Sequence, residues 1–207
     1  MKRGKFIVLE GGEGAGKGAV RQYLQGKLPD ALFTREPGGT PLGERIRAAM
    51  ISPEAKEASA ETQFCLIFAS RLDHVRAKIR PALEAGKTVI SERFDSSTYA
   101  YQIFGQEALH LRPLFSAFRK LLGESIPDLY IFLDVDAETG VRRVKGNDAK
   151  EEPLDHFEKR ALAFHMRVRE GYAEFFKNVP HAIVDANRPL EAVQEEVFTI
   201  IRKHLAT

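Results

Sequence analysis

The sequence predicts an α/β fold of three layers, with a central sheet of five parallel strands flanked on both faces by helices. Five short apolar runs of strand length alternate with longer amphipathic stretches along the 207 residues, a pattern typical of a parallel sheet. The runs are rich in Val, Ile, Leu and Phe and show little alternation, as expected for strands covered on both faces. A glycine-rich turn directly follows the first run, and such sheets bind ligands beyond the carboxyl ends of their strands.

The expected elements follow one another along the chain. Strands are expected at residues 6–9, 31–34, 88–91, 129–134 and 182–185. Helices are expected at 17–27, 42–50, 61–84, 96–122, 154–177 and 189–204, with a break in the fourth of them near Gly105. The stretch 145–153 reads KGNDAKEEP, and its polar character and its helix breakers predict a surface loop.

The composition favours one globular domain that spans residues 1–207. Hydrophobic residues make up 43% and charged residues 29% of the chain, which excludes disorder and fibrous repeats. The formal net charge is only +2, so bulk binding to nucleic acid is not expected. No apolar run approaches a membrane span or follows residues 1–4 as in a signal peptide, so we expect a cytoplasmic protein without membrane contact. Cys65 is the single cysteine, and its apolar neighbours predict that it packs against another element.

The glycine-rich turn has the spacing of a phosphate-binding loop, or P-loop. It comprises Gly11, Gly12, Glu13, Gly14, Ala15, Gly16 and Lys17. Glycine permits the backbone angles that point N–H groups at phosphates, the start of the following helix adds partial positive charge, and Lys17 adds a full charge. Such loops usually continue with Ser or Thr, whose hydroxyl binds magnesium, but Gly18 and Ala19 stand here. Magnesium is therefore expected to depend on carboxylates, water and the nucleotide itself.

Four further blocks point to a family when they are taken together with the P-loop. The segment 34–40 reads TREPGGT, 92–102 reads ERFDSSTYAYQ, Asp134 ends the fourth strand, and 185–189 reads DANRP. In this order the blocks resemble those of the bacterial thymidylate kinases, within the P-loop nucleoside-monophosphate kinase superfamily, over essentially the whole chain. The resemblance implies a P-loop NTPase fold with a small mobile lid at about 142–156, and a homodimer. It also implies transfer of the γ-phosphoryl group of ATP to dTMP, with magnesium, to give dTDP and ADP.

The resemblance further implies roles for individual residues. The catalytic candidates are Lys17, Arg93, Glu13, Glu92 and Arg143, and Glu92 is the candidate magnesium ligand, through water. The residues expected to bind ATP are Gly11, Gly12, Glu13, Gly14, Ala15, Gly16, Lys17, Gly18 and Ala19. The residues expected to bind dTMP are Glu13, Arg35, Pro37, Ile67, Arg71, Arg93, Ser97, Thr98, Tyr101 and Gln102. Phosphoryl transfer depends mainly on positioning and charge neutralisation, so cations from several loops fit this chemistry.

Two departures from the family pattern concern the base pocket and the lid. Members usually stack a Phe on thymine four residues before the Arg that matches Arg71, and this chain has Ile67 there. Phe68 comes one residue later, about 100° round a helix, so it need not face the same pocket. In the lid, 155–158 reads DHFE where members often read Asp-Arg-x-Glu, which leaves Arg142, Arg143 and Lys145 as candidate clamps for the ATP phosphates.

These departures leave three hypotheses open. The first is a dTMP kinase. The second is a related kinase that accepts another deoxypyrimidine nucleotide, which Ile67 motivates. The third is a non-catalytic nucleotide-binding protein, which the missing hydroxyls at Gly18 and Ala19 motivate. Incubation with ATP, magnesium and a panel of nucleoside monophosphates distinguishes them, because only a kinase forms ADP with one of the acceptors.

Overall fold

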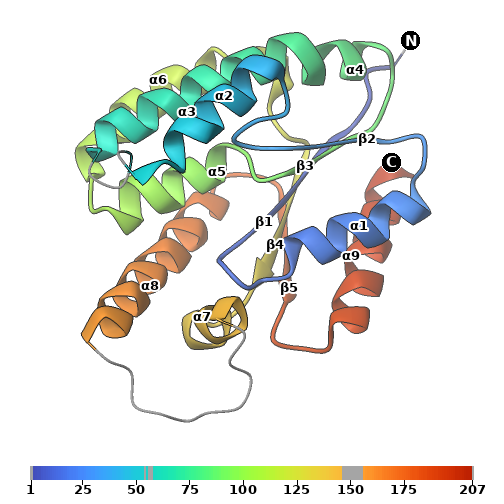
Figure 1. Cartoon of the computed structure of the whole chain (residues 1–207). Helices are drawn as coiled ribbons and strands as arrows, with labels where there is room; N and C mark the ends of the chain where they lie inside the picture. Colours follow the sequence, from blue (N-terminus) through green and yellow to red (C-terminus); the bar gives the residue numbers. More distant parts are fainter. Residues whose placement is uncertain (1, 54, 56–57, 146–155, 207) are drawn as a thin grey trace.

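The computed structural model confirms the predicted α/β fold, with one five-stranded sheet in which all pairings are parallel (Figure 1). The structure describes residues 2–53, 55, 58–145 and 156–206, without the side chains of 145 and 156–161. The strands are β1 (Phe6–Gly11), β2 (Leu32–Arg35), β3 (Val89–Glu92), β4 (Leu129–Asp134) and β5 (His181–Asp185). Their order in the sheet is β2-β3-β1-β4-β5, which places β1 at the centre.

The register of the sheet brings the ends of the strands to one edge. Leu9 of β1 pairs with Glu92 of β3, and Glu92 in turn pairs with Arg35 of β2. On the other side of β1, Gly11 pairs with Leu133, one residue before the end of β4. Because the strands are parallel, the loops that follow β1, β2 and β3 open on the same side of the molecule.

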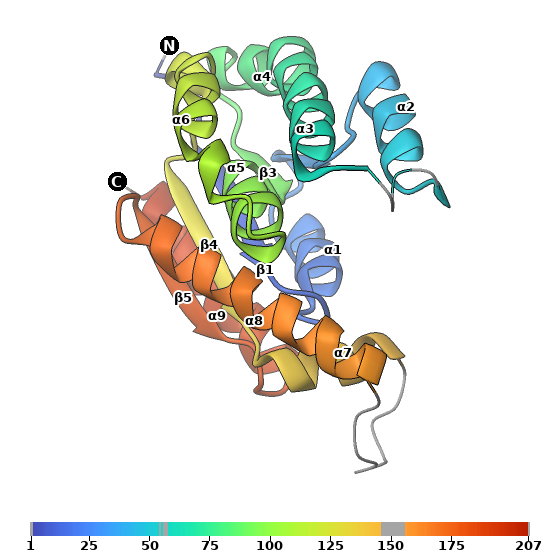
Figure 2. The ribbon, with the colours of Figure 1, turned by 90° about the vertical axis from the view of Figure 1, so that its left-hand side faces the viewer.

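Helices lie on both faces of the sheet (Figure 2), and a hydrophobic core on each face attaches them to it. One face is covered by α1 (Lys17–Lys27) and α9 (Leu190–Leu205). The other is covered by α3 (Ala60–His74), the π-helical η3 (Tyr99–Gly105), α6 (Arg112–Lys120) and α8 (His156–Phe176). Further helical segments are α2 (Pro41–Met50), the π-helical η2 (Val75–Ile79), α4 (Arg80–Glu84), α5 (Asp95–Thr98), α7 (Ala137–Lys145) and the 3-10 turns η4 (Leu109–Leu111) and η5 (Gly123–Ser125).

Close packing of α8 on η3 positions the side chains of both helices. A Cβ atom at Gly171 would lie 2.8 Å from the Cα atom of Ala100, a distance that real side chains do not reach, so α8 approaches η3 at its glycine. The next residue, Tyr172, is consequently fully buried beside the end of β1. The break expected near Gly105 is confirmed, because η3 ends at that residue.

One expectation is wrong, and one helix was not predicted. Cys65 is exposed on the outer face of α3, because the apolar neighbours Phe64 and Ile67 take the inward positions of the helix. The helix α7 lies where only a connection between β4 and the charged loop was expected. Of the lid expected at about 142–156, the end of α7 is described, and 146–155 lie outside the described residues. In the part of the chain that the structure describes, no helix is long and apolar enough to cross a membrane.

Candidate active site

The P-loop connects β1 to α1 and rests against α7. Gly14 and Gly16 have φ angles of 68° and 82°, in the left-handed region that glycine adopts at little cost. A Cβ atom at Gly14 would collide with the carbonyl oxygen of Gly140, so the loop and α7 touch through their backbones. Arg143 of α7 donates hydrogen bonds to the carbonyl oxygens of Gly14 (3.3 Å) and Ala186 (2.8 Å). This arginine therefore joins the P-loop to the segment that follows β5.

Lys17 is buried and folds back over the P-loop. Its Nζ atom donates to the carbonyl oxygens of Gly11 (3.0 Å) and Gly12 (2.7 Å). Burial lowers the pKa of Lys17 to about 7, and the positive charge of Arg93 acts in the same direction. An anion in the loop would favour the charged form of this ammonium group and would compete with the two carbonyl oxygens for it.

A cavity of about 390 Å³ opens beside the P-loop. It is lined by Glu13, Glu36, Pro37, Arg47, Met50, Ile51, Ile67, Arg71, Arg93, Phe94, Ser97, Thr98, Tyr101 and Gln102. Nine of the ten residues predicted to bind the acceptor lie on this wall, and Arg35 is the exception. The Arg35 side chain is 42% exposed and forms an ion pair with Glu44 at 3.0 Å.

The two adjacent residues Ile67 and Phe68 have different surroundings. Ile67 is 7% exposed and lines the cavity. Phe68 is 1% exposed and packs in the core, with its ring centroid 5.9 Å from that of Phe115 and 5.1 Å from that of Phe118. The rotation between neighbouring helix positions therefore places an aliphatic side chain, and not the ring, on the cavity wall.

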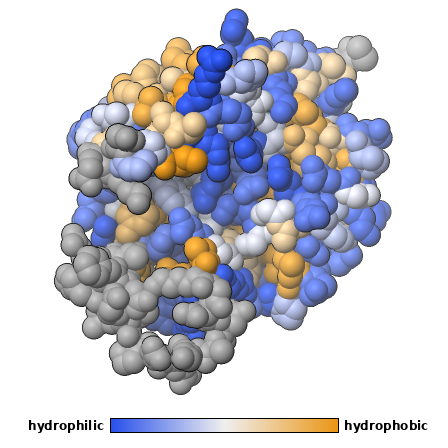
Figure 3. All heavy atoms as spheres, viewed as in Figure 1, coloured by the Kyte–Doolittle hydropathy of each residue, from blue (hydrophilic) through white to orange (hydrophobic). Residues whose placement is uncertain are grey.

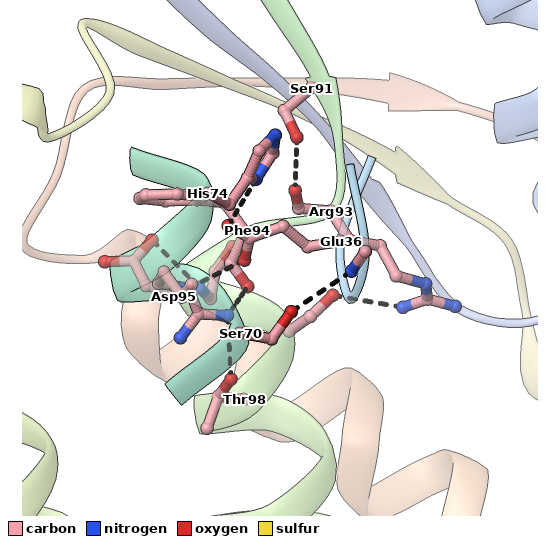
Figure 4. Close-up of polar contacts among 12 residues, drawn as sticks. Glu36, Ser70, His74, Ser91, Arg93, Phe94, Asp95 and Thr98 are labelled. Carbon is pink, nitrogen blue, oxygen red and sulfur yellow. Dashed lines mark hydrogen bonds and ion pairs between the residues drawn. The ribbon is translucent and has the colours of Figure 1, made fainter. Parts of the chain in front are cut away.

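Arg93 lines the cavity from a strained backbone position. Its φ angle of 67° costs a residue other than glycine about 1–3 kcal/mol. The turn is held by the Arg93 N–H, which donates to Leu9 (2.9 Å), and by the Ser91 hydroxyl, which donates to the Arg93 carbonyl (2.8 Å) (Figure 4). The guanidinium group donates to the hydroxyls of Ser97 (3.0 Å) and Tyr101 (3.1 Å), and its Cζ atom lies 4.8 Å from the centre of the Tyr101 ring. These contacts fix one cation in one orientation.

Glu10 holds the hydroxyl groups that surround Arg93, although the sequence did not predict it as a site residue. Its buried carboxylate accepts hydrogen bonds from the Phe94 N–H (2.8 Å), the Ser97 hydroxyl (2.7 Å) and the Tyr172 hydroxyl (2.9 Å). Burial raises the pKa of Glu10, whereas the charge of Arg93 and the donors at Ser97 and Phe94 lower it. A carboxylate at the end of β1 thus supports the turn that presents Arg93.

Arg71 lines the cavity and joins three segments of the chain. Its Nε atom donates to Glu36 (2.7 Å) and its Nη2 atom to the Thr98 hydroxyl (3.0 Å). The second carboxylate oxygen of Glu36 bonds the ring of His74 (3.0 Å), whose other nitrogen bonds the Thr34 hydroxyl (2.7 Å). The buried Nη1 atom of Arg71 has no hydrogen-bond partner within the described residues. Because buried donors are nearly always paired, this atom is available to an acceptor in the cavity.

The carboxylates nearest the P-loop are few. The side chain of Glu92, at the end of β3, is 23% exposed and lies 3.5 Å from the Nε atom of Arg21. Glu13 faces the cavity and lies 3.8 Å from His165 of α8. Among the described residues, no group of three or more His, Cys, Asp or Glu side chains could hold a metal ion.

The end of α2 contributes to the cavity, which the sequence did not predict. Arg47, Met50 and Ile51 line it, and Arg47 donates to the carbonyl oxygen of Pro37 at 3.2 Å. The amphipathic pattern of 42–50 predicted the helix but not its direction in space. Because Pro37 lies in the TREPGGT block just before α2, the short loop between them was the available signal.

Known proteins resemble this chain over most of its length. A model of the thymidylate kinase family matches residues 9–197. The thymidylate kinase of Alkalilimnicola ehrlichii is 45% identical over 199 residues, which cover 93% of this chain and 90% of the relative. That of Pseudomonas fluorescens is 40% identical and covers 96% of this chain and 95% of the relative. That of Ruthia magnifica is 36% identical and covers 98% and 99%.

Proposed function

The chain belongs to the thymidylate kinase family and is an enzyme that phosphorylates dTMP, and we propose that its P-loop holds ATP while the cavity beside the loop holds dTMP. The observation that carries this division is the position of Arg93 between the two. Arg93 lines the cavity, and its charge also reaches Lys17, whose pKa it helps to lower. An anion placed between two cations lowers the energy of their mutual repulsion, and the transferred phosphoryl group is such an anion.

On the donor side, Lys17 exchanges the carbonyl oxygens of Gly11 and Gly12 for the outer phosphates of ATP. Arg143 lies against the P-loop and completes the positive surroundings of the donor from α7. Since Gly18 and Ala19 offer no hydroxyl, Glu92 is the residue that would help to hold magnesium, through water. When bound, magnesium would supply neutralisation of the charge on the phosphates.

On the acceptor side, the monophosphate lies at Arg93 and the base lies at the opposite end of the cavity. Tyr101, held by Arg93, packs against the deoxyribose. The unpartnered Nη1 donor of Arg71 and the Thr98 hydroxyl lie where the edge of a base can accept or donate hydrogen bonds. A thymine carbonyl oxygen satisfies the Arg71 donor, whereas an amino group at that position would leave it unpaired.

A second acceptor is favoured by one observation. Ile67 lines the cavity where a flat ring would stack on the base, so the pocket lacks one aromatic contact. Another deoxypyrimidine monophosphate, dUMP, differs from dTMP only in the 5-methyl group, which is worth about 0.8 kcal/mol. The enzyme should therefore prefer dTMP over dUMP by about fourfold on that contact alone.

The test is a panel assay. The protein is incubated with ATP, Mg²⁺ and each of dTMP, dUMP, dCMP, dGMP and dAMP, and ADP is measured. We expect the highest kcat/KM with dTMP and a turnover about 10²–10³-fold lower in a Lys17→Ala variant, which controls for contaminating kinases. Turnover of another monophosphate with dTMP ignored would reject the acceptor assignment and leave only the kinase assignment.

We also propose a homodimer and a cytoplasmic location, where ATP is available to the enzyme. Apolar side chains gather over the upper left of the molecule in Figure 3, where α2, α3 and α6 lie in Figure 1. On α3, Cys65 and Ala69 face outward. Leu114 on the neighbouring α6 is 37% exposed, and Leu121, directly after that helix, is 57% exposed. A second copy that covers these two helices would bury them. Light scattering should give twice the chain mass for the parent protein and the mass of a single chain for Leu121→Asp.

A further inference from the structure

Three glutamine side chains form a chain of hydrogen bonds that ends at the cavity. Gln63 of α3 lies at its centre. The Nε2 atom of Gln102 on η3 donates to Oε1 of Gln63 at 3.4 Å, and the Nε2 atom of Gln106 donates to the same oxygen at 2.6 Å. Gln102 is 7% exposed and lines the cavity, whereas neither Gln63 nor Gln106 is among the lining residues.

The orientation of the central amide is determined by the backbone. The Nε2 atom of Gln63 donates to the carbonyl oxygens of Ala55 and Ala58, both at 3.3 Å. A carbonyl oxygen can only accept, so the amide nitrogen of Gln63 must face these two groups and its oxygen must face away. That oxygen then accepts from Gln102, and the amide nitrogen of Gln102 must point toward Gln63.

The amide oxygen of Gln102 is consequently left for the cavity. Among the hydrogen bonds of the described residues, none ends on that oxygen, and Gln102 stands one helical turn after Thr98 on the same wall. A bound base therefore meets an acceptor at Gln102 and a donor at the unpartnered Nη1 atom of Arg71. Thymine and uracil present an N3–H donor beside a carbonyl oxygen, and cytosine presents an N3 acceptor beside an amino group.

We propose that Gln63 is a positioning residue that selects the acceptor base by fixing the amide of Gln102 with its oxygen toward the cavity. This inference rests on the proposed function, because it assumes that the base of the acceptor nucleotide lies in this cavity. Gln63 acts through Gln102 and does not itself touch the nucleotide. Without Gln63, the Gln102 amide is free to turn over, and its nitrogen then matches the N3 acceptor of cytosine.

The test compares kcat/KM for dTMP, dUMP and dCMP in the parent and in Gln63→Leu, which removes the acceptor with little change in size. We expect the ratio of dTMP to dCMP to fall by roughly five- to tenfold, the worth of about one hydrogen bond. The ratio of dTMP to dUMP should stay within about twofold, because both bases carry N3–H. If the substitution only loosened the pocket, the ratio of dTMP to dCMP and the ratio of dTMP to dUMP would fall together. If Gln63→Leu does not fold, Gln63→Met serves in its place.

A control variant separates the amide orientation from packing. Gln106→Leu removes the shorter hydrogen bond of the chain but leaves Gln102 anchored, so it should keep the parent ratio of dTMP to dCMP. Calorimetric dissociation constants for dTMP and dCMP provide a second readout where dCMP turnover is slow.

The outcomes distinguish the inference from the proposed function. A parent that does not phosphorylate dTMP would reject both. A parent that phosphorylates dTMP, with an unchanged ratio of dTMP to dCMP in Gln63→Leu, would reject the role of Gln63 alone. A parent that prefers dCMP to dTMP would also reject it, because the fixed amide would then face the wrong way.

Discussion

The acceptor side and the donor side of this site hold their cations by different means. Around the cavity, Arg71 is held by the side chains of Glu36 and Thr98, and Arg93 is held by hydroxyl groups that Glu10 fixes. At the P-loop, Lys17 and Arg143 are held by backbone carbonyl oxygens. Side chains in a buried network keep their partners when a ligand arrives, but phosphate oxygens displace neutral carbonyl oxygens from a cation. For the proposed function, we therefore expect the acceptor side to be formed before binding and the donor side to change its partners on binding.

Replacing Lys17 should give the largest effect and confine it to the donor side. Lys17→Ala removes the charge that meets the transferring phosphoryl group, so kcat should fall by about 10²–10³-fold. The hydrogen-bond partners of Lys17 lie in the P-loop and not around the cavity, so the calorimetric dissociation constant for dTMP should change far less than kcat. Lys27→Ala, at the exposed end of the same helix, is the matched control and should retain full activity. A Lys17→Ala variant that lost dTMP binding as well would mean that the two sides form one network.

Replacing Arg93 should test the acceptor side. Arg93→Ala removes the charged donor for the acceptor phosphate, and we expect dTMP to bind roughly ten- to a hundredfold more weakly, with ATP affinity little changed. It also leaves the buried Glu10 without its neighbouring charge, which should lower the free energy of unfolding. Calorimetry and urea denaturation measure the two effects.

Arg93→Gly is the control for backbone strain at this position. It removes the same charge but accepts the left-handed φ angle without cost. Both variants should lose dTMP affinity equally if the charge is responsible. A normal affinity in Arg93→Gly would mean that the strained turn, and not the guanidinium group, sets dTMP binding.

The pH dependence of ligand binding should also separate the two sides. Because the pKa of Lys17 is lowered to about 7, the free enzyme loses this charge as pH rises above 7, and ATP binding must restore it with uptake of a proton. The affinity for ATP should then fall by up to tenfold per pH unit above about pH 7, until the pKa of Lys17 in the complex is reached. Calorimetry in buffers of different ionisation enthalpy counts the protons. The affinity for dTMP should not follow this curve.

The lowered pKa of Lys17 also makes the free energy of unfolding depend on pH. The pKa of Lys17 is lower in the folded protein than in the unfolded chain, so the unfolded chain binds more protons between about pH 7 and the ordinary lysine value. The contribution of Lys17 to the free energy of unfolding therefore rises with pH through this window. Urea denaturation at about pH 7 and pH 9 should show a rise that Lys17→Met lacks.

The smallest effect concerns the base. Ile67→Phe places a ring on the cavity wall, and an aromatic contact of roughly 0.5–1.5 kcal/mol should tighten dTMP binding about threefold to tenfold. Overpacking opposes this by roughly 1–3 kcal/mol if the position is already full. Ile67→Leu, which keeps the volume without a ring, should leave calorimetric dTMP binding unchanged. Weaker binding by a well-folded Ile67→Phe would assign Ile67 to the core.

The sequence predicted the parts of the site that lie in short, local motifs. The P-loop and the block that contains Arg93 each follow a strand, and their residue order alone indicates a ligand at the edge of the sheet. The helical rotation between Ile67 and Phe68 also followed from spacing, and the structure places Ile67 on the cavity wall as that argument allowed.

Residues whose partners are distant in the sequence could not be predicted in this way. Glu10 stands at the end of an apolar strand, and its partners include Phe94 and Tyr172, far along the chain. Nothing in the sequence near Gln63 indicates that its amide meets Gln102 and Gln106. Such pairs form only when helices from different parts of the chain pack on one another, and local patterns carry no information about that packing.

The backbone contact between Gly14 and Gly140 bears on how this phosphate loop can be engineered. Because neither residue leaves room for a side chain at the contact, the loop and α7 form one fitted part made from two distant stretches of sequence. A graft of residues 11–17 into another scaffold would need the α7 glycine to be transplanted with it. Conversely, Gly140→Ala should distort the loop and inactivate the enzyme, although every residue of the loop itself stays unchanged.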